Sequence, residues 1–342
     1  MNPILICAIF ILLNVFLFFF KNKISSIVSI VDKPDNKKKT HKYDAHVIGG
    51  TIIFLNLLLL FVIFIFTQQE TVFDPKYFNS TKSIISFFFI SFGIYMLGIY
   101  DDKFDLSPNI KLFATSLIFI IAIKIDPTLQ IHTIHFSFTD KVFYIDEFST
   151  LFTLFCFLIF LNAFNMFDGI NLQICTYAIF LFLIFVLNNF LIYISIIFII
   201  SLINYYALNI KGKNFLGDGG NYMLSYIVAY MFIKSYNLDN LFSSDEIFLI
   251  MFIPGVDLLR CTITRLFRGK HPFKGDREHL HFLSMEKIGY LKTYIVIQLL
   301  IIVPYLFSQF LLTNLLSIFV SLILYTSFLL YLRKSRLSHK RP

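Results

Sequence analysis

Long apolar segments separated by short polar ones run through the whole chain. Eleven of them are apolar enough to cross a bilayer as helices, although several fall short of the usual ~20 residues and need tilt or flanking aromatic residues. We therefore predict an all-α polytopic membrane protein with about eleven transmembrane helices. The expected spans are 4–20, 48–66, 83–100, 112–125, 150–164, 172–187, 190–207, 221–236, 246–264, 291–307 and 311–332.

The positive charges predict how these spans are oriented. If the N-terminus is periplasmic and the C-terminus cytoplasmic, all but five of the 29 Lys and Arg residues fall on the inner side or at the nearest helix ends. Cytoplasmic loops carry such an excess. This orientation accounts for the net charge of +8, so no nucleic-acid partner is expected. The expected cytoplasmic loops are 21–47, 101–111, 165–171, 208–220 and 265–290.

Composition agrees with a membrane protein. The chain is 57% hydrophobic and 15% charged, whereas a soluble domain carries about 25% charged residues. We expect one integral-membrane domain over 1–342. The outer segment 126–149 contains stretches of alternating polarity, which predict a short periplasmic β-hairpin. The four cysteines lack metal-ligand spacing and are expected to pack in the interior.

Five polar clusters all fall on the predicted cytoplasmic side, because an even number of crossings separates each from the next. Polar groups are costly near hydrocarbon, so their clustering indicates function. The chemistry that each cluster suggests is ambiguous when it is taken alone. The clusters are 32–50, 98–111, 162–171, 204–220 and 254–281.

Two of the clusters carry acids at the expected ends of spans. Asp101 and Asp102 are adjacent carboxylates that a cation such as Mg²⁺ would stabilise, although a solvated helix end explains them equally well. Asn162, Asn165 and Asp168 are spaced three apart, which places them on one helix face. They could bind a hydroxyl, an amide or the water shell of a metal. Hydrogen bonding between helices is the other explanation.

Two further clusters suggest phosphate binding. Glycines on both sides of Asp218 allow close approach to a ligand, and the N-terminus of the following helix favours an anion, although a plain turn would also fit. The segment 265–281 is rich in Arg and His, which can hold phosphate oxygens. Contact with anionic lipid headgroups would explain its basic residues but not Asp276 or the histidine pair. Together the clusters suit phosphoryl transfer at a bilayer surface.

The order of these motifs resembles the polyprenyl-phosphate N-acetylhexosamine-1-phosphate transferase superfamily, glycosyltransferase family 4, over nearly the whole chain. The His-Leu-His that follows Asp-Arg-Glu is similar to the WecA-type branch rather than the phospho-MurNAc-pentapeptide translocase branch. The residues that carry the resemblance are Asp32, Pro34, Lys38, Lys39, His41, Gly49, Gly50, Gly98, Asp101, Asp102, Lys111, Asn162, Asn165, Asp168, Gly169, Asn171, Asn204, Gly217, Asp218, Gly220, Pro254, Asp257, Arg265, Pro272, Phe273, Asp276, Arg277, His279 and His281.

The resemblance also implies roles for individual residues. Asp101 or Asp102 would position or deprotonate a lipid phosphate, and Asp218 would hold Mg²⁺ (or Mn²⁺) with Asp168 and Asp102 in support. His279 would join the aspartates Asp101, Asp102 and Asp168 in the catalytic set. A direct attack and a covalent aspartyl route are both compatible with these residues. The expected substrate-binding residues are Lys39, His41, Lys111, Asn162, Asn165, Asn171, Asn204, Arg265 and His281.

The implied activity is transfer of an N-acetylaminosugar 1-phosphate from a UDP-sugar to undecaprenyl phosphate, with release of UMP. The expected setting is the bacterial inner membrane, among membrane lipids, with the active site on the cytoplasmic face. The step would start O-antigen or other envelope polysaccharide synthesis, and relatives can be homodimers. Two positions depart from the common pattern, because Asn171 stands where many members have Asp and Asn221 where Ser is common.

Three alternatives remain at this point. The first is a phospho-MurNAc-pentapeptide transferase. The second is a CDP-alcohol phosphotransferase, although Asp168-Gly169 is not followed by the Ala-Arg that such enzymes need. The third is a transporter or flippase, which usually carries polar groups at mid-membrane rather than at the ends of its spans.

Overall fold

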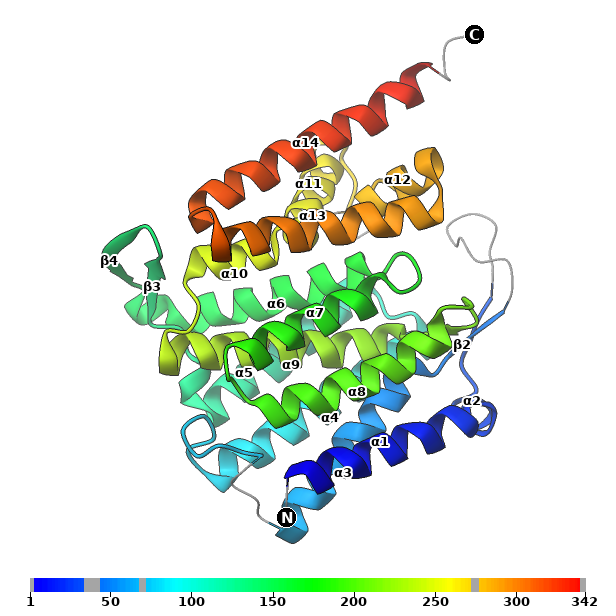
Figure 1. Cartoon of the computed structure of the whole chain (residues 1–342), viewed down its shortest axis with the longest axis vertical. Coiled ribbons are helices and arrows are strands. Elements are labelled where there is room, and N and C mark those ends of the chain that lie inside the picture. The colour runs from blue at the N-terminus through cyan, green and yellow to red at the C-terminus, as the bar shows by residue number, and fades with distance from the viewer. Residues whose placement is uncertain (1–2, 34–43, 68–71, 272–276, 339–342) are drawn as a thin grey trace.

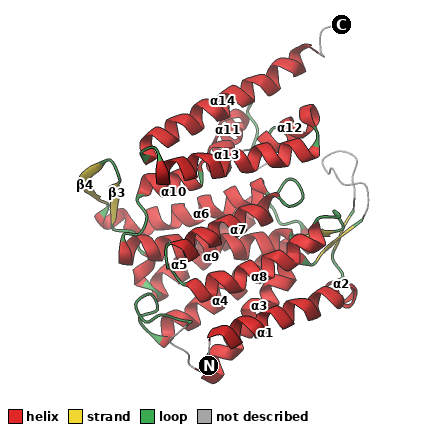
Figure 2. Ribbon diagram, in the orientation of Figure 1, coloured by secondary structure: helices red, strands yellow, loops and turns green. Residues whose placement is uncertain are grey.

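The computed structural model describes residues 3–33, 44–67, 72–271 and 277–338, without the side chains of 335–338. These residues form a bundle of α-helices with two very small sheets (Figure 1, Figure 2). The helices are α1 (Pro3–Phe19), α2 (Lys21–Val28), α3 (Gly49–Thr67), α4 (Thr81–Phe104), α5 (Pro108–Ile125), α6 (Ser149–Phe167), α7 (Gln173–Leu187), α8 (Ile192–Asn209), α9 (Gly217–Asp239), α10 (Ser244–Ile250), α11 (Phe252–Phe267), α12 (Leu280–Ile288), α13 (Tyr290–Phe310) and α14 (Asn314–Ser338). The strands are β1 (Val31–Asp32), β2 (Ala45–Val47), β3 (Thr133–Phe136), β4 (Thr139–Tyr144) and β5 (Asn214–Phe215), and 3₁₀ turns cover Pro127–Leu129 and Asp146–Phe148.

The structure confirms the helical class but not the number of spans. Within the described ranges, seven helices are long and apolar enough to cross a membrane, or up to nine if the bent pairs α1–α2 and α10–α11 each count as one span. The bends are 72° and 77°. The remaining expected spans correspond to α7, which has 15 residues, and to α9, which is not among the candidates. The count of eleven and the orientation therefore stay predictions.

Helix α9 lies inside the bundle and carries the residues around Asp218. Every residue from 219 to 236 is buried, and α9 packs against α3, α4 and α6. Tyr222, Tyr226 and Tyr230 lie four positions apart along its length, and each is 1% exposed. Toward its C-terminal end, Lys234 Nζ lies 2.8 Å from Asp126 Oδ2. A buried ion pair is expected to fix geometry more than it adds net stability, because both charges lose their hydration.

Glycines let three helices meet at the start of α9. A Cβ on Gly98 of α4 would lie 2.5 Å from the backbone oxygen of Asp218. A Cβ on Gly50 of α3 would lie 2.5 Å from the backbone nitrogen of Gly220. These glycines therefore allow backbone-to-backbone packing of helices, as small residues often do in membrane proteins. The sequence interpretation of Gly220 as room for a ligand is replaced here by room for a neighbouring helix.

The two sheets lie at opposite ends of the bundle (Figure 1). The antiparallel hairpin β3–β4 confirms the hairpin expected within 126–149. The other sheet, with the order β1-β2-β5, was not foreseen. Its central strand β2 pairs antiparallel with β1 and parallel with β5, so it joins the first expected cytoplasmic loop to the fourth.

Replacing Gly98 with Ala should separate α4 from α9, because the added Cβ has no room beside Asp218. We expect a loss of about 1–3 kcal/mol in stability, the usual cost of overpacking. Gly93→Ala on the same helix is the matched control, because a Cβ there would meet no atom within 4 Å. Thermal unfolding of the purified protein in detergent, followed by circular dichroism, should show a lower Tm for Gly98→Ala only. Equal Tm values for both variants would contradict this packing.

Candidate active site

Residues from four of the five polar clusters line one cavity of about 800 Å³. The described lining residues include no Lys, Arg or His. Any anionic substrate that entered would therefore need additional positive charge. The polar lining consists mainly of four carboxylates and four amides, namely Asp32, Asp102, Asp168, Asp218, Asn165, Asn171, Asn209 and Asn221.

The carboxylate of Asp102 caps the N-terminus of α9. Its Oδ1 accepts a hydrogen bond from the backbone N–H of Asp218 at 2.9 Å, and its Oδ2 accepts from Gly219 at 3.2 Å. Gly217 makes room for this contact, with φ of +77° and no space for a Cβ beside Asp102. The N-terminal amides that the sequence suggested for an anionic ligand are thus bonded to a carboxylate of the protein itself. This contact fixes the position of Asp218 relative to α4.

The neighbouring carboxylate of Asp101 points to different partners. Asp101 is 2% exposed, and its Oδ2 lies 2.8 Å from Lys111 Nζ and accepts from the Tyr222 hydroxyl at 2.7 Å. Asp101 is not among the lining residues of the cavity. Lys111 Nζ also lies 3.9 Å from Asp218 Oδ2, so this lysine holds the two acids together rather than projecting freely toward a substrate.

Asp168 and Asp218 are carboxylates in surroundings that disfavour their charge. Burial raises the pKa of Asp168 to about 6, and the amide of Asn221 offsets part of this effect by donating to Oδ2 at 2.8 Å. Burial, together with the nearby charges of Asp102 and Asp101, raises the pKa of Asp218 well above its ordinary value. A bound cation would relieve this crowding. Carboxylate and amide oxygens are also the ligands that Mg²⁺ prefers.

The predicted asparagines divide into two groups. Asn165 and Asn171 line the cavity, whereas Asn162 and Asn204 do not. The side chain of Asn162 donates to the carbonyl of Leu158 in its own helix at 2.7 Å. Asn204 on α8 donates to Asn14 Oδ1 on α1 at 3.1 Å. The Asn204 contact joins two helices, whereas the Asn162 contact lies within one helix and does not match the alternative of hydrogen bonding between helices.

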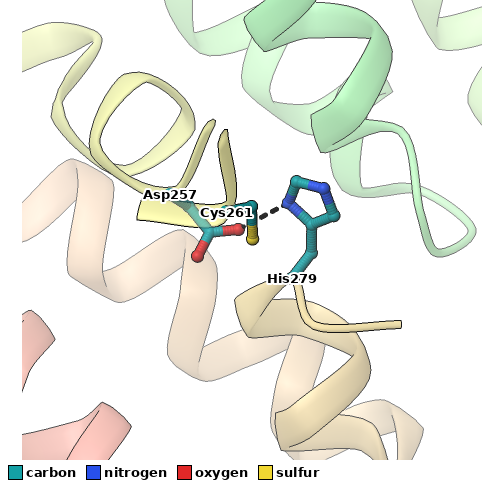
Figure 3. Close-up of side chains that lie close together, drawn as sticks. All are labelled: Asp257, Cys261 and His279. Atoms are coloured by element: carbon teal, nitrogen blue, oxygen red, sulfur yellow. Dashed lines mark hydrogen bonds and ion pairs between the residues drawn. The ribbon is translucent and has the colours of Figure 1, made fainter. Parts of the chain in front are cut away.

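A second group of predicted residues is buried at α11 and α12. His279 Nδ1 lies 2.8 Å from Asp257 Oδ2 (Figure 3). On the other side of the ring, Arg265 Nη2 lies 3.1 Å from His279 Nε2. A guanidinium can only donate, so Nε2 is the acceptor and the proton of the neutral ring sits on Nδ1. Asp257 thus sets the tautomer of His279, and His279 in turn holds Arg265.

Asp257, Cys261 and His279 offer ligand atoms within 4.8 Å of one another (Figure 3). A positive charge already lies among them, because Arg260 Nη2 is 2.7 Å from Asp257 Oδ1 and 3.2 Å from Cys261 Sγ. Asp257 and Arg260 thus form an ion pair between positions three apart on α11. This arrangement suits an ion-pair network that braces His279, and it is a poor site for a metal cation.

His281 connects this network to the cavity. A Cβ on Gly169 would lie 1.8 Å from His281 Nε2, so the imidazole stands directly against the turn that follows Asp168. The ring is parallel to that of His279, with centroids 5.7 Å apart. Burial lowers the pKa of His281 to about 3, which keeps it neutral. Gly169 is needed here because any side chain would displace the histidine.

Some predicted residues are not placed, and some placed residues were not predicted. Lys39, His41 and Asp276 lie outside the described residues. Asn209 was missed, although it lines the cavity and accepts from the backbone N–H of Leu172 at 2.6 Å. Asn221 was noted only as a departure from the family pattern. Its position one helical turn after Asp218 could have indicated that the two side chains share a helix face and a site.

The comparisons with known proteins agree with the motif order. The glycosyl transferase family 4 model matches residues 84–236. The chain is 26% identical over 299 residues to the undecaprenyl-phosphate alpha-N-acetylglucosaminyl 1-phosphate transferase of Salmonella typhi, covering 82% of this chain and 77% of that protein. The Thermotoga maritima protein of the same name is 28% identical over 289 residues, covering 82% of both chains. The Escherichia coli K12 protein of that name is 25% identical over 291 residues, covering 80% and 75%. The chain is therefore similar to glycosyl transferase family 4 over residues 84–236, and to two of these transferases over 82% of its length.

The raised pKa of Asp168 should appear in the pH dependence of stability. Because folding favours the protonated form, the contribution is fully present below the unfolded pKa of about 3.8 and is lost as pH rises through about 6. We expect the Tm of the unmutated protein to fall, relative to that of Asp168→Asn, between about pH 4 and about pH 7. Asn at this position can still accept from Asn221, which makes it a conservative control. A Tm difference that stays constant with pH would contradict the assignment.

Proposed function

We propose that the protein transfers an N-acetylhexosamine 1-phosphate from a UDP-sugar to undecaprenyl phosphate and releases UMP. The single observation that carries the proposal is the acidic cavity built from Asp102, Asp168 and Asp218 at one end of the helical bundle. The curated names of the relatives add the acceptor, undecaprenyl phosphate, and point to GlcNAc as the sugar.

The transfer needs no group beyond the two substrates to balance. An oxygen of the lipid phosphate attacks the β-phosphorus of the UDP-sugar, and the bond from that phosphorus to the oxygen bridging the two phosphates breaks. UMP leaves with the bridging oxygen, and the lipid keeps a new diphosphate linkage to the sugar. All of the reacting groups are anionic, so the work of the protein is to position them and to offset their charge.

We propose Mg²⁺, or Mn²⁺ in its place, as the group that offsets this charge. Asp168 and Asp218 would hold it, because both line the cavity and both lie where their own negative charge is disfavoured. The cation would polarise the diphosphate and stabilise the negative charge that develops on its oxygens. Asp102 would support the cation site without binding the cation directly, because its two oxygens already accept hydrogen bonds from the first amides of α9.

The Arg–His network has a separate role in this proposal. Arg265 supplies positive charge and hydrogen-bond donors for the donor phosphates, while His279 holds Arg265 and Asp257 holds His279. The contact between His281 and Gly169 supports this role, because Gly169 belongs to the wall of the cavity. Lys111 holds Asp101 and Asp218 in a fixed arrangement.

The proposed setting is the bacterial inner membrane, with the cavity open to the cytoplasm. The support is the distribution of Lys and Arg along the sequence, which puts the loops that build the cavity on the inner side. UDP-sugars are cytoplasmic metabolites, so this orientation would give the cavity access to its donor. Initiation of an O-antigen or other envelope polysaccharide is the step that such a lipid product would serve.

The decisive experiment is an assay of the purified protein in detergent. We expect UMP release from UDP-GlcNAc only when undecaprenyl phosphate and Mg²⁺ are both present, with a lipid product of matching mass. A panel of UDP-amino sugars, including UDP-QuiNAc, UDP-FucNAc and UDP-GalNAc, identifies the preferred donor. No UMP release from any of them would contradict the proposal and would favour a transporter.

Replacing Asp218 with Asn should abolish most of this activity. The variant keeps the size of the side chain but loses the charge that faces the cavity, so we expect UMP release to fall about 100-fold or more. Asp140→Asn is the matched control, because Asp140 is exposed on the hairpin strand β4 at the other end of the bundle. Steady-state UMP release measures both variants. Similar losses in the two, or none in Asp218→Asn, would remove Asp218 from the mechanism.

A further inference from the structure

Asn221 is a buried polar residue in the wall of the cavity that the proposed mechanism does not yet use. It is 3% exposed and belongs to the lining of the cavity. It follows Asp218 by three positions on α9, so the two side chains lie on the same face of the helix.

The two ends of the Asn221 amide have different surroundings. Its Nδ2 donates to Asp168 Oδ2 at 2.8 Å. The group nearest an ionised carboxylate must be the N–H donor, which fixes the orientation of the amide. Its Oδ1 is buried and has no hydrogen-bond partner among the described residues. A buried acceptor without a partner costs about 1–3 kcal/mol, so this oxygen calls for an explanation, and a bound ion or water is one.

The surroundings of this oxygen favour a cation over an anion. Asp168 is bonded to Asn221 itself, and Asp218 lies one helical turn away. The part of the cavity wall that the structure describes has no basic side chain. An amide oxygen is a hard, neutral ligand for Mg²⁺ or Mn²⁺, and it completes a coordination shell without adding negative charge to a site that is already crowded with carboxylates.

We propose that Asn221 Oδ1 is a ligand of the divalent cation, between Asp168 and Asp218, while Nδ2 of the same amide holds Asp168 in position. The inference deepens the proposed function, because it rests on the cation that the transfer is proposed to use. One amide thus binds the cation through Oδ1 and holds Asp168 through Nδ2. Variants that remove one or both of these atoms should differ in their affinity for the cation.

The test measures binding of Mn²⁺ alone to the full-length protein in detergent, with no donor or lipid acceptor present. Electron paramagnetic resonance of free Mn²⁺ gives the affinity. The variants are Asn221→Ala, which removes both ends of the amide, and Asn221→Asp, which keeps an oxygen but loses the N–H. Asn188→Ala is the matched control, because that amide donates to the carbonyl of Ile184 at the C-terminal end of α7 and does not line the cavity. Tm values without metal report whether each variant folds.

The proposal expects a specific order of affinities. Asn221→Ala should bind Mn²⁺ about tenfold or more weakly than the unmutated protein, in the range seen when groups around a metal are removed. Asn221→Asp should stay within about threefold of the unmutated protein, because an oxygen ligand is restored. Asn188→Ala should bind normally.

Three results would overturn the inference: normal Mn²⁺ binding by Asn221→Ala, equally weak binding by both Asn221 variants, or no binding by the unmutated protein. The second result would leave Asn221 with only its hydrogen bond to Asp168. Because the measurement uses no substrate, it is separate from the assay of UMP release. The expected order of affinities in a protein that releases no UMP would support the ligand assignment and contradict the proposed function alone.

Discussion

The attachment of the Asp102 carboxylate to the first amides of α9 is the contact on which the site depends. Helix N-termini carry unsatisfied N–H groups and a partial positive charge, and a carboxylate there is worth about 0.5–2 kcal/mol. Here the capping group comes from α4 rather than from the chain just before α9. One bond pattern therefore joins two helices and fixes Asp218 beside Asp102. The close packing of Gly98 and Gly50 against the same turn makes this distance possible.

The same turn explains why adjacent aspartates have different tasks. Neighbouring residues on a helix point about 100° apart, so the side chains of Asp101 and Asp102 point in different directions. Asp101 turns into the bundle toward Lys111 and Tyr222, while Asp102 turns to α9 and the cavity. Lys111 offsets the charge of Asp101 and, at longer range, that of Asp218. Asp101 and Asp102 thus connect α4 to α5 and α9, and Asp102 also contributes to the acidic wall of the cavity.

The sequence predicted the helical class, the hairpin and the convergence of polar clusters, because these follow from hydropathy, alternation and the parity of crossings. It could not predict which member of a cluster faces the cavity. Asn162 and Asn165 are the same residue type three positions apart, yet only Asn165 lines the cavity, and this depends on how α6 is rotated in the bundle. The β1-β2-β5 sheet was also hidden, because strands of two or three residues leave no periodic signal.

The structure separates negative from positive charge more sharply than the motif order suggests. The cavity wall carries carboxylates and amides, whereas Arg260 and Arg265 do not line it and are held in a network with Asp257 and His279. A diphosphate substrate brings its own negative charge, so the acidic wall would repel it unless a cation lies between them. The neutral form of His279 adds no charge to either group of residues, and its Nε2 accepts from Arg265 and so orients the guanidinium. Binding of cation and binding of donor should therefore depend on each other, since each supplies the charge that the other lacks.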